Sequence, residues 1–154
     1  MALAVFLAAV IAGSDLPREG LTDAVLRVQT NVTADGGVIR APDGLFYVTG
    51  TVNGVPVRFL VDTGASATVL TREDALRAGV LPTIAEFRNV AETANGASPV
   101  TWVNVGELEV AGLHVREMPA AVSSGGLKVS LLGQDWLSWL DSVTIAGDRM
   151  VLRY

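Results

Sequence analysis

The sequence predicts an all-β domain, namely a small closed barrel with one or two short helices. Short runs of β-branched and aromatic residues, such as 46–52 and 55–61, recur between turn signals from position 45 onward, and this pattern is typical of barrels. Asn53-Gly54, between these two runs, is the strongest two-residue signal for a β-hairpin. The length of 154 residues suits one domain with a modest core.

The first 43 residues differ in composition from the rest. We divide the chain into an apolar segment at 1–14 that resembles a signal or membrane anchor, an extension or linker at 15–43, and a folded domain at 44–154. Residues 2–12 form an uninterrupted apolar run, which is too short to span a bilayer but has the length of a signal-peptide core. An ordinary apolar helix packed on the domain is the alternative. We expect a periplasmic or membrane-associated protein, with the cytoplasm as the other location.

Composition argues against several classes of site. The chain has no cysteine, which rules out disulfides, thiol catalysis and cysteine-ligated metals. Its single histidine, His114, makes a classical zinc site improbable, and we expect His114 to be an exposed strand residue without a catalytic role. The formal net charge is -5, with no basic stripe, so a nucleic-acid partner is not expected. No cofactor and no metal are expected either.

Turn and cap signals place the remaining elements. Thr71 begins an S/T-x-x-acid helix start, and Gly79 is a natural helix end. Asn95-Gly96 is a second hairpin signal. Strands are expected at 85–94, 100–105, 107–110, 113–122 and 129–133, and in a closing hairpin at 143–145 and 150–152.

A second helix is expected at 134–141, because its apolar residues, two tryptophans among them, share one face. We expect Trp136 and Trp139 in the core, with burial at a dimer face as the alternative. Trp102 fits either the core or a groove, and the sequence does not decide between them.

The stretch around Asp62 is where we expect chemistry. The apolar run 59–61 leads directly into Asp62, and a Thr-Gly-Ala-Ser turn follows. An ionised carboxylate at the end of a buried strand is costly unless something stabilises it, and such a placement is more often functional than accidental. The alternative is a turn acid that caps the backbone of the loop.

Three elements resemble, in order, the retropepsin-type aspartic proteases, in particular the bacterial clan AA proteins related to retroviral proteases. They are Leu-Val-Asp-Thr-Gly-Ala-Ser at 60–66, the Thr-Ala-Asn-Gly hairpin at 93–96, and Leu-Leu-Gly at 131–133 followed by a short helix. The resemblance covers residues 45–154 and implies the acid-protease barrel.

The resemblance also implies a mechanism. Two carboxylates face each other around one water and share one proton, because two like charges so close do not both ionise readily. The ionised acid takes a proton from water, and the protonated acid polarises the scissile carbonyl. This chain has one Asp-Thr-Gly and is too short for two lobes. The implied active form is a homodimer in which each subunit contributes Asp62 at the two-fold axis.

Supporting roles follow from the same resemblance. Thr63 would bond across the dimer axis, and Gly64 would allow the tight turn. The other supporting residues would line the groove (Ala65 and Ser66), form the tip of a flap that closes over the peptide (Asn95 and Gly96), and pack under the active-site loop (Leu132 and Gly133).

The sequence departs from the retroviral pattern at two positions. Retroviral enzymes have an Asp after the Ala of the motif and an Arg after the apolar-apolar-Gly, whereas this chain has Ser66 and Gln134. The loss of both members of a charged pair looks concerted, and a neutral hydrogen bond could replace it.

The sequence therefore predicts a dimeric aspartic endopeptidase that acts on proteins or peptides. One alternative is a non-catalytic dimeric module that binds extended peptides on the same fold by strand addition. Another is an enzyme that processes its own N-terminal segment.

Overall fold

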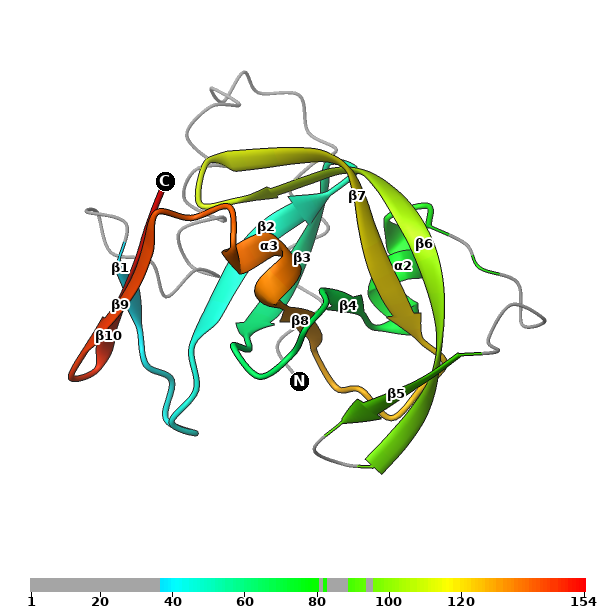
Figure 1. Cartoon of the computed structure of the whole chain (residues 1–154), viewed down its shortest axis with the longest axis horizontal. Coiled ribbons are helices and arrows are strands. Elements are labelled where there is room, and N and C mark those ends of the chain that lie inside the picture. Colours follow the sequence, from blue (N-terminus) through cyan, green and yellow to red (C-terminus); the bar gives the residue numbers. More distant parts are fainter. Residues whose placement is uncertain (1–36, 81, 83–88, 94–95) are drawn as a thin grey trace, which may run out of the picture.

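A computed structural model describes residues 37–80, 82, 89–93 and 96–154 (Figure 1). The predicted apolar segment 1–14, most of the predicted linker and the flap residue Asn95 lie outside the described residues. Among the described helices, none is long and apolar enough to cross a membrane.

Most strands of the described chain form one closed barrel. The seven-stranded sheet has the order β2-β3-β8-β4-β7-β6-β5, and an additional β2–β6 pairing closes its first six strands on themselves. The predicted all-β barrel with short helices is thus confirmed. In sheet order, the strands are β2 (Tyr47–Val52), β3 (Val55–Val61), β8 (Ser130–Leu132), β4 (Val69–Leu70), β7 (Leu113–Ser123), β6 (Gly96–Val110) and β5 (Asn89–Thr93).

A separate three-stranded sheet lies at one side of the barrel (Figure 1). Its order is β1-β10-β9, with β1 (Gly37–Ile39) and β9 (Ser142–Ala146) both antiparallel to β10 (Arg149–Arg153). The predicted closing hairpin is confirmed as β9 and β10. Strand β1 lies inside the range that we predicted as linker, so ordered structure starts before position 44.

The β2–β3 hairpin brings the chain to Asp62. Asn53 and Gly54 have φ values of 49° and 79°, as a two-residue type I′ turn requires at both central positions. The predicted Asn-Gly hairpin is confirmed, with Val52 paired to Val55.

The first predicted helix is confirmed as α2 (Arg72–Arg77). The hydroxyl of Thr71 accepts a hydrogen bond from the amide of Asp74 at 3.1 Å and caps the helix N-terminus. Gly79, just past the helix end, has a φ of 70°, which glycine tolerates better than any other residue.

The second predicted helix is shorter than expected. Helix α3 spans Gln134–Leu137, so the prediction of helix to position 141 is wrong. The amide of Trp139 donates to the carbonyl of Trp136, which tightens the last turn. The amide of Asp141 donates to the carbonyl of Arg153 and draws the chain into the β9–β10 sheet. Trp136 is fully buried as predicted.

Strand β6 corrects another expectation. We predicted separate strands at 100–105 and 107–110, but β6 runs through both without interruption. Gly106 is accommodated because the pairing with β7 resumes in the same register on either side, with Val105 opposite Met118 and Glu107 opposite Arg116. Glu117, the residue of β7 that lies between these two pairs, has a left-handed backbone with a φ of 50°.

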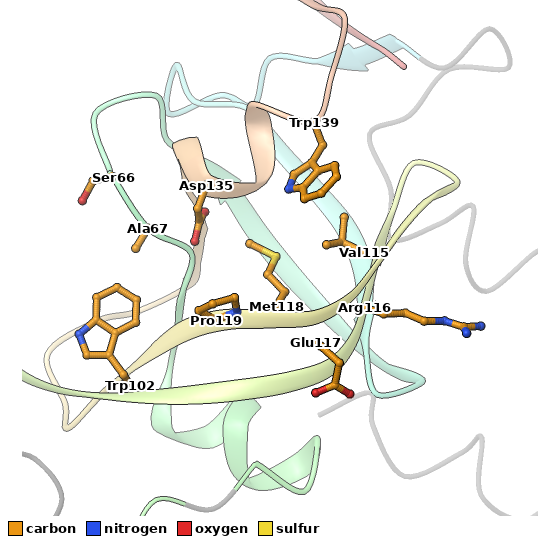
Figure 2. Close-up of a pocket in the computed structure, with 10 residues that line it drawn as sticks. All are labelled: Ser66, Ala67, Trp102, Val115, Arg116, Glu117, Met118, Pro119, Asp135 and Trp139. Carbon is orange, nitrogen blue, oxygen red and sulfur yellow. The ribbon is translucent and has the colours of Figure 1, made fainter.

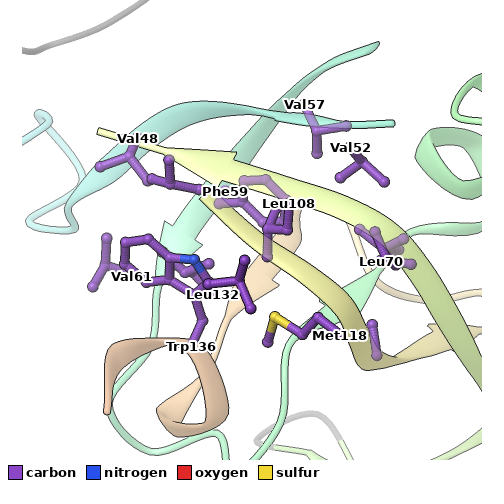
Figure 3. Close-up of a cluster of buried hydrophobic side chains, with 14 of the residues drawn as sticks. Val48, Val52, Val57, Phe59, Val61, Leu70, Leu108, Met118, Leu132 and Trp136 are labelled. Atoms are coloured by element: carbon purple, nitrogen blue, oxygen red, sulfur yellow. The ribbon is translucent and has the colours of Figure 1, made fainter. Parts of the chain in front are cut away.

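The core fills the barrel and extends under α3 (Figure 3). Alternate residues of β2 and β3 point inward, as the period of two requires. Trp136 lies over one end of this core, and its buried indole Nε1 has no hydrogen-bond partner among the described residues. The largest fully buried side chains include Trp136, Phe59, Leu70, Leu108, Leu132 and Met150.

A polar network around Asp74 joins α2 to strand β8. The hydroxyls of Ser130 and Thr71 donate to Asp74 Oδ2 at 2.6 and 2.9 Å, and Arg77 donates to Oδ1. Partial burial acts to raise the pKa of Asp74, but the hydrogen bonds from Ser130, Arg77 and Thr71 outweigh it and hold the pKa below its ordinary value.

This lowered pKa makes part of the stability dependent on pH. Because the folded-state pKa of Asp74 lies below its ordinary value of 3.8, the stabilisation is complete above that value and is lost as the pH falls through the folded-state pKa. We expect Asp74→Asn to lower the free energy of unfolding by about 1–2 kcal/mol at neutral pH. The loss should shrink under strongly acidic conditions, as measured by urea denaturation.

Asp148→Asn is the matched control. Asp148 pairs with Arg40 at the surface, and its side chain is 87% exposed, so we expect a change below about 0.5 kcal/mol. An Asp74→Asn loss of equal size at neutral and strongly acidic pH would contradict the assignment.

Candidate active site

Asp62 directly follows β3 and is tied to the neighbouring strand β8. The two strands run parallel, with Val61 paired to Leu132. The amide of Asp62 donates to the carbonyl of Leu132 at 3.1 Å and extends this ladder by one bond. Leu132 is fully buried, so Asp62 starts its loop from a fixed position at the edge of the core.

The carboxylate of Asp62 organises its own loop. Its Oδ1 accepts a hydrogen bond from the amide of Gly64 at 2.9 Å, and its carbonyl accepts one from the amide of Ala65 at 3.2 Å. Asp62 is half-buried, while Thr63, Gly64 and Ser66 are exposed. Asp62 therefore caps the backbone of the loop, as the turn-acid alternative predicted, and the residue is also partly exposed to solvent.

The start of α3 holds this loop from below. The amide of Gln134 donates to the carbonyl of Ala65 at 2.8 Å, and its side-chain Nε2 donates to the carbonyl of Thr63 at 2.9 Å. The amide of Asp135 donates to the carbonyl of Ser66 at 3.3 Å. A neutral hydrogen bond does replace the retroviral ion pair, but Gln134 makes it with a backbone carbonyl of the loop and not with the Ser66 side chain.

Gly133 allows this approach because it has no side chain. A Cβ at position 133 would lie 2.3 Å from both the carbonyl carbon and the carbonyl oxygen of Ala67, and 2.9 Å from the amide nitrogen of Thr68. These are backbone atoms, which cannot rotate away. Glycine is therefore the residue that fits where β8 and α3 meet the end of the active-site loop.

A pair of hydrogen-bonded residues that the sequence analysis missed, Thr68 and Asp135, completes the support. Thr68 is 1% exposed, and its amide and hydroxyl donate to Asp135 Oδ1 at 2.9 and 2.8 Å. The amide of Gly133 donates in turn to the Thr68 hydroxyl at 3.3 Å. Each residue carries a local signal that could have singled it out: Thr68 is a threonine inside an apolar run, and Asp135 is an acid at the start of a helix.

An open pocket of about 290 Å³ adjoins the loop (Figure 2). Ser66 and Ala67 line it on the side of the loop, and Met118 lies between Trp102 and Trp139. Trp139 is 61% exposed, so the prediction that it lies in the core is wrong; it follows the end of α3, where the helical face no longer applies. Trp102, left open between core and groove, is 55% exposed and lines the pocket.

The predicted flap region forms a hairpin. Strands β5 and β6 are antiparallel, and Thr93 pairs with Gly96; the predicted tip residue Asn95 lies outside the described residues. Gly96 is the first residue of β6. The closing of this hairpin over a substrate stays a prediction.

The other titratable groups considered in the sequence lie apart from the loop. His114 is exposed on β7, as predicted, and its Nδ1 lies 2.9 Å from Glu107 Oε1. The part of the chain that the structure describes holds no group of three or more acidic or histidine side chains arranged to bind a metal.

A closed barrel with an acid on a loop that is held by a glycine and a short helix is the arrangement of the aspartic proteases. Comparison with known proteins gives the same class. Residues 48–139, more than half of the chain, match the family described as "gag-polyprotein putative aspartyl protease". The chain belongs to the retropepsin-like aspartic protease family.

Solved structures give the same assignment. A retropepsin-like aspartic protease from Rickettsia conorii is 32% identical with a TM-score of 0.67, over 77% of this chain and 89% of that one. The EIAV protease, solved with the inhibitor HBY-793, shares the fold at 22% identity and a TM-score of 0.54, over 65% of this chain and 91% of that one.

Two bacterial relatives are longer proteins. An uncharacterized protein of Rickettsia prowazekii is 35% identical over 76% of this chain and 50% of its own length. An uncharacterized Sinorhizobium protein, described by its position in the cobV 5' region, is 38% identical over 72% of this chain and 48% of its own length. The chain thus spans about half the length of these curated relatives.

The contact at Gly133 yields a sharp stability prediction. We expect Gly133→Ala to lower the free energy of unfolding by about 3 kcal/mol or more, because the added Cβ meets backbone that cannot rotate away. The matched control is Gly125→Ala, where a Cβ meets nothing within 4 Å and φ is not positive. Urea or thermal unfolding measures both, and equal stability of the two variants would contradict the packing described.

Proposed function

We propose that this protein is an aspartic endopeptidase whose active site is completed by two copies of Asp62 in a homodimer. The observation that carries the proposal is the placement of Asp62, half-exposed at the end of β3 in a loop fixed to β8 and α3. Family membership supports this role.

The proposed chemistry needs a proton donor and a proton acceptor around one water. One Asp62 carboxylate takes a proton from the water as its oxygen attacks the scissile carbonyl carbon, while the protonated Asp62 of the second copy donates to the carbonyl oxygen. The Asp62 that took the water proton then passes it to the leaving nitrogen as the C–N bond breaks, and the other Asp62 recovers its proton from a hydroxyl of the diol intermediate. Because the reaction needs one ionised and one protonated acid at the same time, activity is expected under mildly acidic conditions.

The loop geometry serves this step by fixing the acid before substrate arrives. The bond from the Gly64 amide orients one carboxylate oxygen, and the described residues donate no hydrogen bond to the other, Oδ2. A carboxylate held on a rigid loop needs little reorganisation during the reaction. Thr63 is exposed on the same loop, and on this proposal it contacts the second copy.

A single protomer supplies only half of this pair. The hydrogen bonds of the described residues include none between Asp62 and another carboxyl group. The sequence has one Asp-Thr-Gly. On this proposal an isolated protomer is inactive.

Strand β9 supports dimer formation. It is an edge of the β1-β10-β9 sheet, its sequence Ser-Val-Thr-Ile-Ala carries no charge, and Ile145 is 52% exposed. Exposed uncharged edge strands are templates for pairing with another chain, and natural proteins normally protect such edges. Antiparallel pairing of two β9 strands about a two-fold axis would join the two sheets into one.

The acid itself gives the first test. We expect Asp62→Asn to reduce peptide hydrolysis by at least about 10²–10⁴-fold, since the variant cannot exchange the proton that the reaction needs. The assay uses a peptide library under mildly acidic conditions, with and without a transition-state-mimicking inhibitor of aspartic proteases. Asp43→Asn, at an exposed turn acid, is the matched control and should keep wild-type activity.

Two other results would decide against the proposal. Cleavage by Asp62→Asn at the wild-type rate would remove Asp62 from the mechanism. Peptide binding without any turnover, and without dependence on Asp62, would favour the non-catalytic binding module.

The interface gives the second test. We expect Ile145→Lys to weaken dimerisation, because it places like charges on two edges that would otherwise pair. Sedimentation should then show more monomer, and specific activity should fall at low protein concentration and recover at high concentration. Leu76→Lys is the control, since Leu76 is equally exposed on α2 at the far side of the barrel (Figure 1). An Ile145→Lys variant that remains fully dimeric would exclude β9 as the interface.

A further inference from the structure

The pocket beside the active-site loop has two accessible aromatic walls. Trp102 comes from β6 and Trp139 from the turn after α3, and both are more than half exposed. Figure 2 shows the two indoles at opposite ends of the pocket with Met118 between them. Large aromatic side chains gathered on the surface of one pocket mark a binding site more often than an isolated exposed residue does.

A carboxylate forms part of this otherwise largely apolar surface. Asp135 lines the pocket, and its carboxyl group points into the space between Ala67 and Met118 (Figure 2). Its Oδ1 accepts bonds from Trp136 and from the amide and hydroxyl of Thr68, whereas its Oδ2 accepts one bond, from the Thr68 amide. Oδ2 therefore has capacity for a further donor.

The carboxylate decides which chemistry fits. An apolar or aromatic occupant would cover the carboxylate and leave the remaining acceptor capacity of Oδ2 without a donor, which is unfavourable. A cation would compensate Asp135, and its charge would also be attracted to the faces of Trp102 and Trp139. The methylene stem of a long basic side chain would pack on Met118.

We propose that this pocket is a distal subsite that binds an arginine or lysine side chain of an extended peptide substrate. The inference rests on the proposed endopeptidase function. Arginine is the better fit of the two, because its planar guanidinium both stacks on indole rings and donates paired hydrogen bonds to a carboxylate. The formal net charge of -5 adds long-range attraction for basic peptides.

The chain itself sets the distance from the scissile bond. Ser66 lines the pocket and follows Asp62 by four positions, so their Cα atoms are at most about 15 Å apart. An extended peptide advances about 3.3 Å per residue. The near edge of the pocket therefore lies within about five residues of extended peptide from Asp62, and we expect the bound basic residue at about that distance from the cleaved bond.

Strain at the pocket wall fits a binding role. Glu117 lines the pocket with a φ of 50°, and left-handed backbone at a non-glycine residue is concentrated at functional sites. The Glu117 carboxylate accepts a hydrogen bond from Asn104 Nδ2 and points away from Trp139 and Met118 (Figure 2), so Asp135 is the acid that faces the pocket. The neighbouring Arg116 side chain points away from Trp102 and Trp139 (Figure 2), so it does not oppose a bound cation there.

Cleavage-site profiling on a proteome-derived peptide library provides the test, because such a library covers many candidate cleavage sites at once. For the wild-type protein we expect arginine and lysine to be enriched at one position within about five residues of the cleaved bond. Trp139→Ala should lose this enrichment among the bonds that it cleaves. Leu76→Ala removes a side chain outside the pocket that is also more than half exposed and should keep the wild-type profile.

Matched peptides then separate charge from size. One cleaved peptide is made with arginine, citrulline or phenylalanine at the enriched position. We expect kcat/KM to be about tenfold higher for arginine than for citrulline, falling to about twofold in Trp139→Ala and at high salt. A preference for phenylalanine would overturn the basic assignment, and equal rates for all three would overturn the subsite.

A binding measurement keeps this test apart from the test of catalysis. The Asp62→Asn protein is titrated with the arginine and citrulline peptides, and the ratio of the two dissociation constants should again be about tenfold. If the wild-type protein cleaves nothing, the proposed catalysis fails, yet the binding ratio still decides the subsite. Equal binding of both peptides would overturn the subsite even if cleavage is strong.

Discussion

The contact between Gly133 and the backbone of Ala67 and Thr68 is the constraint on which the rest of the site depends. With no Cβ at position 133, α3 starts directly beneath the loop, and its first residues bind three loop carbonyls. The Thr68–Asp135 hydrogen bonds then fasten the far end of the loop to the same helix. Asp62 is held at its own end by β8. The acid is thus fixed by a short stretch that lies far from it in the sequence.

Much of this arrangement could be predicted from the sequence because the signals are local. Asn53-Gly54, the Thr71 cap and the apolar run before Asp62 each act through their immediate neighbours, and the structure places them as expected. The closed barrel followed from the recurrence of such runs.

The errors arose where long-range packing overrides local pattern. The apolar face at 134–141 continues past Leu137, but the bond from Asp141 to Arg153 draws the chain away, and Trp139 turns out to solvent. Gly106 looked like a strand end, yet β7 continues its pairing on both sides. The role of Thr68 depends on Asp135, which is distant in sequence, so no window of neighbouring residues contains both partners.

Strand β9 has a consequence for inhibition. Its exposed, uncharged edge is five residues long and belongs to a sheet apart from the loop that carries Asp62. If two such edges pair in the active dimer, a short peptide copying β9 could occupy the edge of one protomer and prevent the second from docking. Such a compound would act without entering the substrate groove. Its potency would depend on enzyme concentration, and added substrate would not simply displace it.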